Sequence, residues 1–558
     1  PVMARYRCEV CGYVYDEANR LRFTVNPQGG VTEQRYDPAG QRVSVRQYAG
    51  QINLAGLPEQ ATLAEVQQRL QTNDDKDLQT YLLYDRDGRQ TLSIDAAGAV
   101  TQQLFDRAGN VAQTRRYATA YPLDAGRRSL LAAGQGLQDI VLAELVASDA
   151  DRVDSYVYDA AGRLRFHLNS ARAVVETNYD LAGRVVDRRE YADFPPTITH
   201  AAIAAGMVSA DDITSDLSET NWELMRGASY VYDGAGRLSF TLTRVHDATR
   251  WGYGDGVNAI LVQRNIYDGS GNIVSNVAYT FALEALRDAD AYSSEAAVIA
   301  ALFDESGEPQ GSEMGAQRST HHVYDQAGRE RFSVGPDGAV TEYRYDATGQ
   351  RLETRRYGEA VEPRRWGEGE LAATVAGIGS VRISSQAYDE AGRVISRTDP
   401  LMAVERYQYD GAGQLLTYTD KNQAVWTYQY DAAGRRTLEN SPVVIVSIAG
   451  VDGTLSTVAR SVSTLTEYDA LGNVTRRIED AGTPTSRATE YEYDSRGLQI
   501  RTRFPDAGHL NSDGQLVATG ERPTVEVTYN ALGQAVMQKD VLGYYSYNTY
   551  DAAGRLQF

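Results

Sequence analysis

The sequence contains few residues of the kinds that build metal sites, and few lysines. Its 558 residues include two cysteines, six histidines and three lysines, and the formal charge is −20. Two cysteines cannot complete a tetrathiolate metal site within one chain. The negative charge opposes binding to nucleic acid or to anionic lipid. No run of about 18 apolar residues is present, so we expect no membrane-spanning helix.

The sequence also lacks the local signatures of catalysis. It has no Gly-x-Ser-x-Gly elbow, no His-Glu-x-x-His, no Gly-Lys-Ser/Thr phosphate loop and no dinucleotide fingerprint after a strand. His321 and His322 are neighbours on an expected strand, so their side chains point to opposite faces. Most carboxylates belong to one repeated phrase, whereas a catalytic pair is expected at a single place. We therefore predict no active site, no cofactor and no enzymatic activity.

The sequence is rich in one short phrase, Tyr-Asp followed by two variable residues and usually by Gly-Arg, Gly-Gln or Gly-Asn. Seven intervals between copies equal 21 residues, which indicates a tandem repeat. The seventeen copies, in which Phe105 replaces Tyr once and Asn530 replaces Asp once, begin at Tyr15, Tyr36, Tyr84, Phe105, Tyr158, Tyr179, Tyr232, Tyr267, Tyr324, Tyr345, Tyr388, Tyr409, Tyr430, Tyr468, Tyr493, Tyr529 and Tyr550.

Each unit has the pattern of a β-hairpin. Alternating β-branched and aromatic residues, as in 21–25 and 31–36, fit the pleated surface of a strand. In Asp-x-x-Gly the Asp can bond amides of the turn that it opens, and Gly accepts a positive φ. The motif is therefore first a turn signal. Its representative residues are Tyr15, Asp16, Tyr36, Asp37, Gly40, Tyr158, Asp159, Gly162, Arg163, Tyr430, Asp431, Gly434 and Arg435.

Tyrosine and arginine follow the same repeat. Tyr accounts for 37 of the 51 aromatic residues, and seven units carry a second Tyr two positions before the first, hence on the same face. We expect the rings to stack in a row while each hydroxyl finds a polar partner. The alternative is a surface on which sugars or other ligands stack. Arg outnumbers Lys by 52 to 3, and guanidinium groups after the turn Gly suit fixed contacts to Asp, carbonyls or Tyr rings.

A longer order lies above the 21-residue unit. Five pairs of units each end in a further Tyr twelve residues after the second motif, and an insert follows each pair. Segments 61–70, 129–146 and 283–302 have helical spacing. We expect inserts that decorate one side of a continuous sheet or cap it. The tyrosines that end the pairs are Tyr48, Tyr117, Tyr191, Tyr279 and Tyr357.

This order predicts one elongated body over residues 1–558 without separate globular domains. The expected super-modules cover about 13–80, 81–153, 154–227, 228–318 and 319–383, and further repeats with shorter inserts cover 384–558.

Cys8 and Cys11 allow two interpretations. Residues 7–16, RCEVCGYVYD, resemble the first metal-binding knuckle of rubredoxins, in which two knuckles hold one iron through four thiolates. The second knuckle is missing, so iron or zinc would need thiolates from a partner chain or another segment. Residues 13–16 also lie in register with the repeat strand at 156–159, which favours an incidental Cys pair. Positions three apart on a strand point to opposite faces, which disfavours a disulfide.

The repeated phrase, as in 158–163 and 430–435, resembles the YD repeats of the rearrangement-hotspot (RHS) family over nearly the whole chain. Members include bacterial polymorphic toxins, shell-forming components of insecticidal toxin complexes and the extracellular teneurins of animals. The resemblance implies a mostly β fold, in which a continuous antiparallel sheet spirals into a hollow shell or barrel with short helical inserts. In bacterial members the shell encloses a C-terminal toxin domain, and in teneurins it serves adhesion.

The leading functional hypothesis from this resemblance is a non-enzymatic shell that encapsulates or delivers a polypeptide effector. The expected partner is an enclosed cargo or an adjoining toxin domain, and the expected location is secreted or on a bacterial cell surface. The alternative is an extracellular adhesion or filament protein whose inserts bind glycans, proteins or further copies of the chain. An acidic lining would hold a basic cargo, but net charge does not assign the acidic groups to a face.

One feature of the toxin shells is not matched. They usually end in a segment with Asp-Pro-x-Gly motifs that supports self-cleavage. Asp399-Pro400 is not followed by that Gly, and the phrase from Asp540 to Gly543 lacks the Pro, so neither receives a cleavage role. The repeats run to both ends of the sequence, and we expect the chain to be a fragment of a larger protein.

Overall fold

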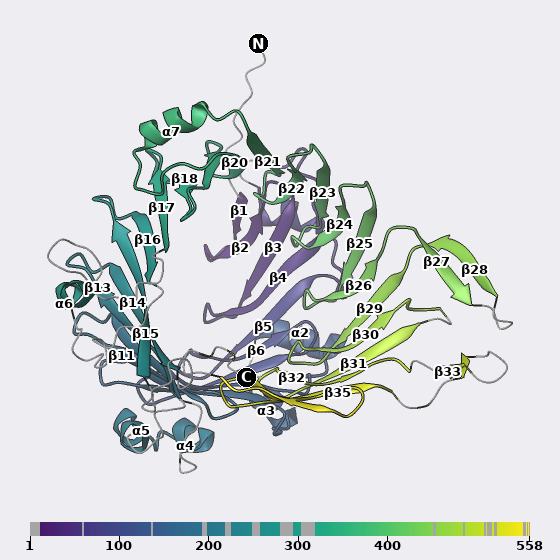
Figure 1. Cartoon of the computed structure of the whole chain (residues 1–558). Coiled ribbons are helices and arrows are strands. Elements are labelled where there is room, and N and C mark those ends of the chain that lie inside the picture. Colours follow the sequence, from purple (N-terminus) through teal and green to yellow (C-terminus); the bar gives the residue numbers. More distant parts are fainter. Residues whose placement is uncertain are drawn as a thin grey trace.

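The chain folds into one long antiparallel sheet of 33 strands within the residues that the computed structural model describes. The described residues are 12–58, 61–134, 138–191, 198–217, 225–247, 257–279, 294–302, 318–449, 454–483, 486–506, 509–510, 516–517, 520, 522–550, 554 and 556. The expectation of a continuous, mostly β antiparallel sheet is confirmed. The sheet is not closed on itself, because its first and last strands each pair with a single neighbour (Figure 1).

The first part of the sheet consists of five groups of four strands, each strand paired with the next along the chain. The strands are β1 (Gly12–Tyr15), β2 (Leu21–Val25), β3 (Gly30–Tyr36), β4 (Arg42–Gln51), β5 (Leu78–Tyr84), β6 (Gln90–Asp95), β7 (Val100–Phe105), β8 (Val111–Arg116), β9 (Arg152–Tyr158), β10 (Leu164–Leu168), β11 (Val174–Tyr179), β12 (Val185–Tyr191), β13 (Met225–Tyr232), β14 (Leu238–Asp247), β15 (Val257–Tyr267), β16 (Ile273–Tyr279), β17 (Arg318–Tyr324), β18 (Glu330–Val334), β19 (Val340–Tyr345) and β20 (Arg351–Tyr357).

The second part of the sheet runs on without helices between its described strands. Hairpins β27–β28 and β33–β34 form small sheets of their own, so β26 pairs with β29 and β32 pairs with β35. The strands are β21 (Val381–Tyr388), β22 (Val394–Thr398), β23 (Val404–Tyr409), β24 (Leu415–Thr419), β25 (Val425–Tyr430), β26 (Arg436–Asn440), β27 (Val444–Ala449), β28 (Leu455–Arg460), β29 (Ser463–Tyr468), β30 (Val474–Glu479), β31 (Arg487–Tyr493), β32 (Gln499–Arg503), β33 (His509–Leu510), β34 (Leu516–Val517), β35 (Thr524–Tyr529), β36 (Ala535–Lys539) and β37 (Tyr545–Tyr547).

Helices follow each of the five four-strand groups. Figure 1 shows α4, α5, α6 and α7 on the outside of the curved sheet, so we call the helix-bearing side the convex face and the opposite side the concave face. None of the helices in the described ranges is long and apolar enough to cross a membrane. The helices are α1 (Leu63–Gln67), α2 (Ala125–Ala133), α3 (Gln138–Glu144), α4 (His200–Ala204), α5 (Ala210–Leu217), α6 (Glu295–Leu302) and α7 (Glu368–Ala376).

The helices differ in extent from the segments with helical spacing. In 61–70 only α1 forms, starting at a capping box between Thr62 and Glu65. Segment 129–146 holds the end of α2 and then α3, because Gly134 adopts φ 66° and ends α2. In 283–302 only α6 is described, since 283–293 lies outside the described residues. The segments with helical spacing do not include α4, α5 or α7, which the structure adds.

Five hydrophobic clusters join the convex face to the helices. In the first group Phe23, Val25 and Val31 of the sheet pack with Val66 of α1. Burying such side chains stabilises the fold by about 25 cal/mol per Å² of apolar surface. None of the five clusters includes a residue of β21 to β37. The equivalent sheet residues of the other groups are Leu92, Ile94 and Val100; Phe166, Leu168 and Val174; Phe240, Leu242 and Val262; and Phe332, Val334 and Val340.

The second part of the sheet coils past the first and touches it through its turns. The Arg116 guanidinium donates to the Leu471 carbonyl (3.2 Å), and Arg152 Nε donates to the Ser495 carbonyl (3.3 Å). These pairs are separated by 355 and 343 residues, which is the length of one coil at these points. We call this contact between successive coils the seam.

Candidate functional site

The repeated phrase forms a hydrogen-bonded turn in which every part of the motif has a contact. Gly162 N–H donates to the Asp159 carbonyl, and Asp159 N–H donates to the Arg163 carbonyl, both at 2.9 Å. Asp159 Oδ1 accepts from the amides of Ala161 and Arg163, while Arg163 Nε donates to Oδ2 at 2.8 Å. Gly162 has φ 75°, which residues with a Cβ seldom adopt. The same side-chain bonds recur at Asp16, Asp180, Asp233, Asp325, Asp389 and Asp431.

Not every copy of the turn carries the full set of residues. The first copy has Asn19 in place of Gly, at φ 58°. The second has Gln41 after Gly40, so Asp37 Oδ1 accepts the Gln41 amide without a guanidinium on Oδ2. Asn is tolerated at φ > 0 better than most residues, and the backbone bonds of the turn do not depend on the Arg. The turn geometry is therefore robust to these departures.

Backbone donors keep the turn carboxylates ionised. The amide of Arg20 is the largest influence that lowers the pKa of Asp16 below its ordinary value, against a smaller opposing effect of burial. The amide of Arg184 acts in the same way on the pKa of Asp180. A carboxylate that accepts amide bonds favours its charged form. These carboxylates therefore serve the turn and are not poised to exchange protons near neutral pH.

Arginines from one turn cover the tyrosine that precedes the next turn. The Arg163 guanidinium lies over the Tyr179 ring, 4.8 Å from its centroid, and Nη1 donates to the Asp180 carbonyl at 3.0 Å. The Tyr179 hydroxyl donates to the Leu164 carbonyl at 2.9 Å. Arg435 makes the same contacts with the Tyr468 ring and the Asp469 carbonyl.

The expected row of stacked tyrosine rings is not what holds these residues. Among the described ring contacts, none joins two tyrosines that begin the repeated phrase. Guanidinium groups lie over those rings instead, and such cation–π contacts contribute about 0.5–1 kcal/mol each at exposed sites. Each contact links one hairpin to the next. The repeat motif is thus a mechanical joint along the sheet.

A second joint, which the sequence analysis missed, lies on the convex face. Glu342 is almost fully buried and accepts from the Tyr357 hydroxyl (2.7 Å) and from Arg344 Nε (3.2 Å), while Arg331 lies 3.6 Å away. Burial and the bond to Glu342 raise the pKa of Tyr357 to about 12. The sequence does contain a signal for this bond, because the Glu or Gln that accepts it always precedes the Tyr by fifteen residues. The pairs are Glu33 with Tyr48, Gln102 with Tyr117, Glu176 with Tyr191, and Glu342 with Tyr357.

The seam brings the two coils into backbone contact. Gly411 N–H donates to the Ala49 carbonyl at 2.9 Å. A Cβ at Gly411 would lie 2.8 Å from the Gly50 oxygen, and a Cβ at Gly30 would lie 2.4 Å from the Gly411 oxygen. Both are closer than a side chain tolerates, so glycine is required for this approach. Burial raises the pKa of Asp410, which opens this turn.

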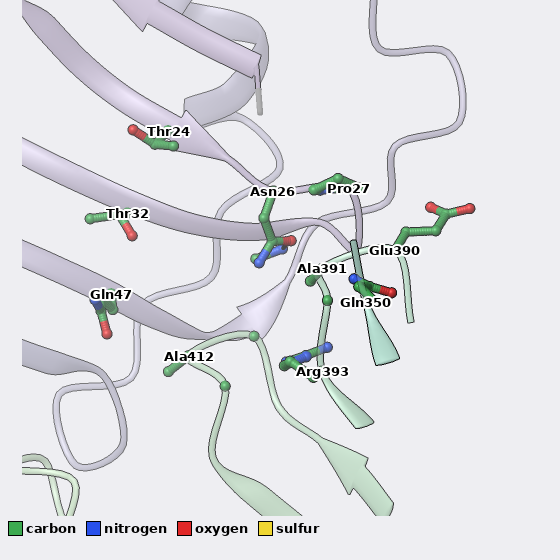
Figure 2. A pocket seen from close by; sticks show the side chains of 14 residues that line it. Thr24, Asn26, Pro27, Thr32, Gln47, Gln350, Glu390, Ala391, Arg393 and Ala412 are labelled. Carbon is green, nitrogen blue, oxygen red and sulfur yellow. Dashed lines mark hydrogen bonds between the residues drawn. The ribbon is translucent and has the colours of Figure 1, made fainter. Parts of the chain in front are cut away.

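A hollow of about 480 Å³ opens beside this contact. Figure 2 shows Asn26 and Thr32 of the N-terminal coil on one side of it, and Ala391 and Ala412 from turns of the second coil on the other. Asn26 Oδ1 accepts hydrogen bonds from the amides of Gln28 and Gly30 in its own turn. The hollow is therefore lined by groups that already serve the two coils, and it belongs to the seam.

The structure also brings together one serine and one histidine that sequence reasoning did not connect. Ser155 Oγ lies 2.8 Å from His200 Nδ1, and burial lowers the pKa of His200. Gln113 Nε2 lies 3.4 Å from the same Ser155 Oγ. Ser155 has no exposed surface, so no substrate reaches its hydroxyl. The pair joins α4 to β9 and is structural.

The remaining candidate residues are accounted for as follows. Cys8 and Cys11 lie outside the described residues. Within those residues, no group of three or more His, Cys, Asp or Glu side chains could hold a metal ion. His321 is buried in the sheet, whereas His322 bonds Asn276 at 2.8 Å, so the two point to opposite faces as predicted. The turn at Asp399 is an ordinary one, closed through the Met402 amide.

Comparison with known proteins gives one family match. Residues 309–443 match the family described as teneurin YD-shell. No curated protein matches the chain.

Several solved structures resemble the chain over nearly its whole length. The crystal structure of TcdB2-TccC3 without the hypervariable C-terminal region is 15% identical, with a TM-score of 0.46 over 97% of this chain and 26% of that one. The crystal structure of TcdB2-TccC3-Cdc42 is 14% identical, with a TM-score of 0.41 over 98% of this chain and 33% of that one. The Photorhabdus luminescens Tc holotoxin pore is 14% identical, with a TM-score of 0.28 over 97% and 33%. The chain thus spans a quarter to a third of the length of these structures.

The region that matches the family lies within the repeats. The match covers β17 to β26, which include both the last helix-bearing group and the start of the single-layered part of the sheet. The repeated phrase and the 33-stranded antiparallel sheet extend on both sides of that region. Residues 309–443 of the chain are thus similar to the YD-shell family, and the repeat of which they are part continues on both sides.

Proposed function

We propose that this chain forms part of the wall of a non-enzymatic shell that encloses or delivers a polypeptide effector. The observation that carries the proposal is the unequal use of the two faces of the sheet. The five hydrophobic clusters lie on the convex face, under the helices. A sheet usually buries one face to form its own core. Here the core lies outside the curve, and the concave face is left for contents.

The residues of the concave face support this proposal. They are the repeat tyrosines and the polar residues in phase with them: Thr32 pairs with Thr24 and Gln47, and Ser93 pairs with Thr101. A polar lining does not bind the apolar side chains of an unfolded polypeptide strongly. Such a surface suits an enclosed polypeptide that must later be released.

The partner and the setting follow from the same proposal. We infer that the effector is a toxin domain continuous with this chain or adjoining it, and that the protein acts outside the bacterial cell or on its surface. We further propose that each four-strand group with its helices is one super-module, over about 13–80, 81–153, 154–227, 228–318 and 319–383. Residues 384–558 then extend the wall as further repeats.

Electron cryo-microscopy of the protein at its natural length tests this function. We expect an enclosed cavity bounded by the concave face, holding density that the repeats do not account for. An open sheet or a filament without such a cavity would refute the shell.

A second candidate function is adhesion or self-association through the inserts, and one observation favours it. The inserts carry exposed apolar side chains on the convex side: Leu130 of α2 is 56% exposed, Ile140 of α3 is 54% exposed, and Met207 between α4 and α5 is 73% exposed. Exposed apolar groups are typical of contact surfaces when they gather. Lateral contacts through these inserts in the same microscopy experiment would support this function instead.

A further inference from the structure

A second hollow, of about 690 Å³, lies on the concave face over β19 to β23. Its strand residues are in phase with the repeat tyrosines: Tyr343 pairs with Thr354, Thr354 pairs with Ser384, and Gln386 pairs with Arg397. They therefore point away from the helices. If the chain is the wall of a shell, this hollow faces the contents.

Four arginines around the hollow form no ion pair within the described residues. Arg351, Arg356, Arg382 and Arg397 are all exposed and make no ion pair there, although most arginines of the chain do. Arg351 lies over the Tyr343 ring at 5.4 Å from its centroid. The hollow is thus basic although the chain as a whole carries −20. Charges beyond about 8–10 Å are screened at ordinary ionic strength, so the local groups decide what binds.

The nearest carboxylates are already engaged. Asp399 pairs with Lys421 at 2.9 Å. Glu405 accepts from the hydroxyls of Tyr407 (3.1 Å) and Tyr418 (3.0 Å). Glu353, which also lines the hollow, pairs with Arg355 at 2.8 Å, so Glu405 is the one lining carboxylate without a cationic partner among the described residues, and the guanidinium groups outnumber it.

The arrangement carries an electrostatic cost. Arg356 and Arg382 are direct cross-strand partners in the register of β20 and β21. Like charges placed opposite each other destabilise a sheet. A bound anion would remove this repulsion, because one carboxylate can accept from two guanidinium groups.

The same strand positions in an earlier group show what is missing here. Arg116 and Arg152 are also cross-strand partners, and both donate to backbone carbonyls across the seam. In that group Asp154 lies 2.9 Å from His167 and supplies a local carboxylate. Asp154 occupies the position that Ser384 has beside the hollow.

The counterpart of His167 beside the hollow is Arg397. In the register of their strands, His167 pairs with Tyr156 and Arg397 pairs with Gln386. The later group has therefore gained a guanidinium at this position and lost the carboxylate of Asp154, while Glu405 lies directly opposite Arg397 in the register of β22 and β23. The excess positive charge of the hollow therefore comes from Arg351, Arg356 and Arg382.

We propose that this hollow binds a carboxylate-rich segment of the enclosed polypeptide, an inference that rests on the proposed shell. The guanidinium groups donate charge-assisted hydrogen bonds to the carboxylates. A row of rings continues from the hollow along the same face, with Tyr407, Tyr418 and Trp426 at successive centroid distances of 5.3 and 5.5 Å. The row offers stacking surface for aromatic side chains that alternate with the acidic ones. The acidic lining and basic cargo considered from net charge are thus reversed at this place.

Binding of labelled peptides to the isolated chain tests the proposal, with fluorescence anisotropy as the readout. The probes are twelve-residue peptides of sequence (Glu-Ser-Tyr)₄, (Gln-Ser-Tyr)₄ and (Lys-Ser-Tyr)₄. We expect the acidic peptide alone to bind, and raising the salt concentration to weaken it. The double variant Arg382→Gln/Arg397→Gln should weaken binding by about tenfold or more, since bonds to charged groups are lost.

Arg406→Gln is the matched control. Arg406 lies on β23 next to Glu405 but pairs with Ser396 and Thr419 on the convex phase of the sheet, and it is exposed. It should leave binding unchanged. Thermal unfolding of all variants should coincide, which separates loss of the site from loss of the fold.

Three results would overturn the proposal. If the Gln peptide binds as tightly as the Glu peptide, the arginines donate to backbone carbonyls of the peptide, as Arg116 and Arg152 do across the seam. Complete displacement by millimolar inorganic phosphate would show a general anion site. Unchanged binding in the double variant would place the peptide elsewhere. None of these results depends on whether a closed cavity exists, so the shell and the hollow fail separately.

Discussion

The substitution Gly411→Ala tests whether the seam holds the two coils together. The new Cβ would lie 2.8, 2.9 and 3.0 Å from the oxygens of Gly50, Tyr48 and Ala49, whereas ordinary contact begins at 3.4 Å. The coils must move apart by roughly half an ångström, which weakens the packing across the gap and stretches the bond from the Gly411 amide to Ala49. Overpacking and a weakened hydrogen bond together cost about 1–3 kcal/mol at the seam.

Hydrogen–deuterium exchange of the amides in 410–414 measures this cost directly. Exchange there should become roughly 5- to 150-fold faster, because each 1.4 kcal/mol corresponds to a factor of ten. Amides in the middle of β14 should not change, since that strand is far along the sheet and pairs only with its neighbours. Gly50→Ala is the control, because its Cβ would meet nothing within 4 Å. Equal protection at 410–414 in Gly411→Ala and the unaltered chain would show that the coils do not rest on each other there.

Four further substitutions test the repeated turn and the buried bond between Glu342 and Tyr357 by chemical denaturation. Asp159→Asn keeps the Oδ1 acceptor and should cost less than about 1 kcal/mol, whereas Asp159→Ala should cost about 1–2 kcal/mol by leaving turn amides unpaired; equal losses would show that the side-chain bonds do not matter. Gly162→Val forces a β-branched residue to φ 75° and should cost about 1–3 kcal/mol, with no loss expected if the turn relaxes. The pKa of Tyr357 is raised to about 12 in the folded chain, so its contribution is complete below pH 10 and is lost as the pH rises to 12. Tyr357→Phe should therefore be less stable than the unaltered chain at pH 8 and should lose less stability between pH 10 and 12; parallel pH profiles would contradict the bond to Glu342.

The local structure could be predicted because its causes lie within a few residues. The Asp159 side chain bonds amides two and four positions ahead, and Gly162 supplies the positive φ at the third position. Both residues, the Asp and the Gly, belong to the repeated phrase itself, and the phrase recurs at intervals of 21 residues. Alternation likewise places Phe23 and Val25 on the same face of the sheet, and the structure shows that this face packs against α1.

The joints between units were predicted less well. Stacked tyrosine rings were expected, but the guanidinium group of the preceding turn covers the ring instead, as Arg163 covers Tyr179. The buried bond between Glu342 and Tyr357 joins residues fifteen apart on adjacent strands. Its spacing is visible in the sequence, yet only the register of the pairing shows that the two side chains meet.

The sequence alone determined the repeat, the turns, the antiparallel hairpins and the places where inserts interrupt them, because these depend on short-range bonds and on alternation. The tertiary structure decided which face is concave, how far the sheet turns before it meets itself, and which arginines find partners. Arg116 and Arg356 illustrate the difference, since they occupy the same place in their groups. The first meets a carbonyl 355 residues away, and the second borders a hollow without a described partner. The number of residues in one coil depends on strand twist and insert geometry accumulated over many strands, and no short sequence pattern determines that total.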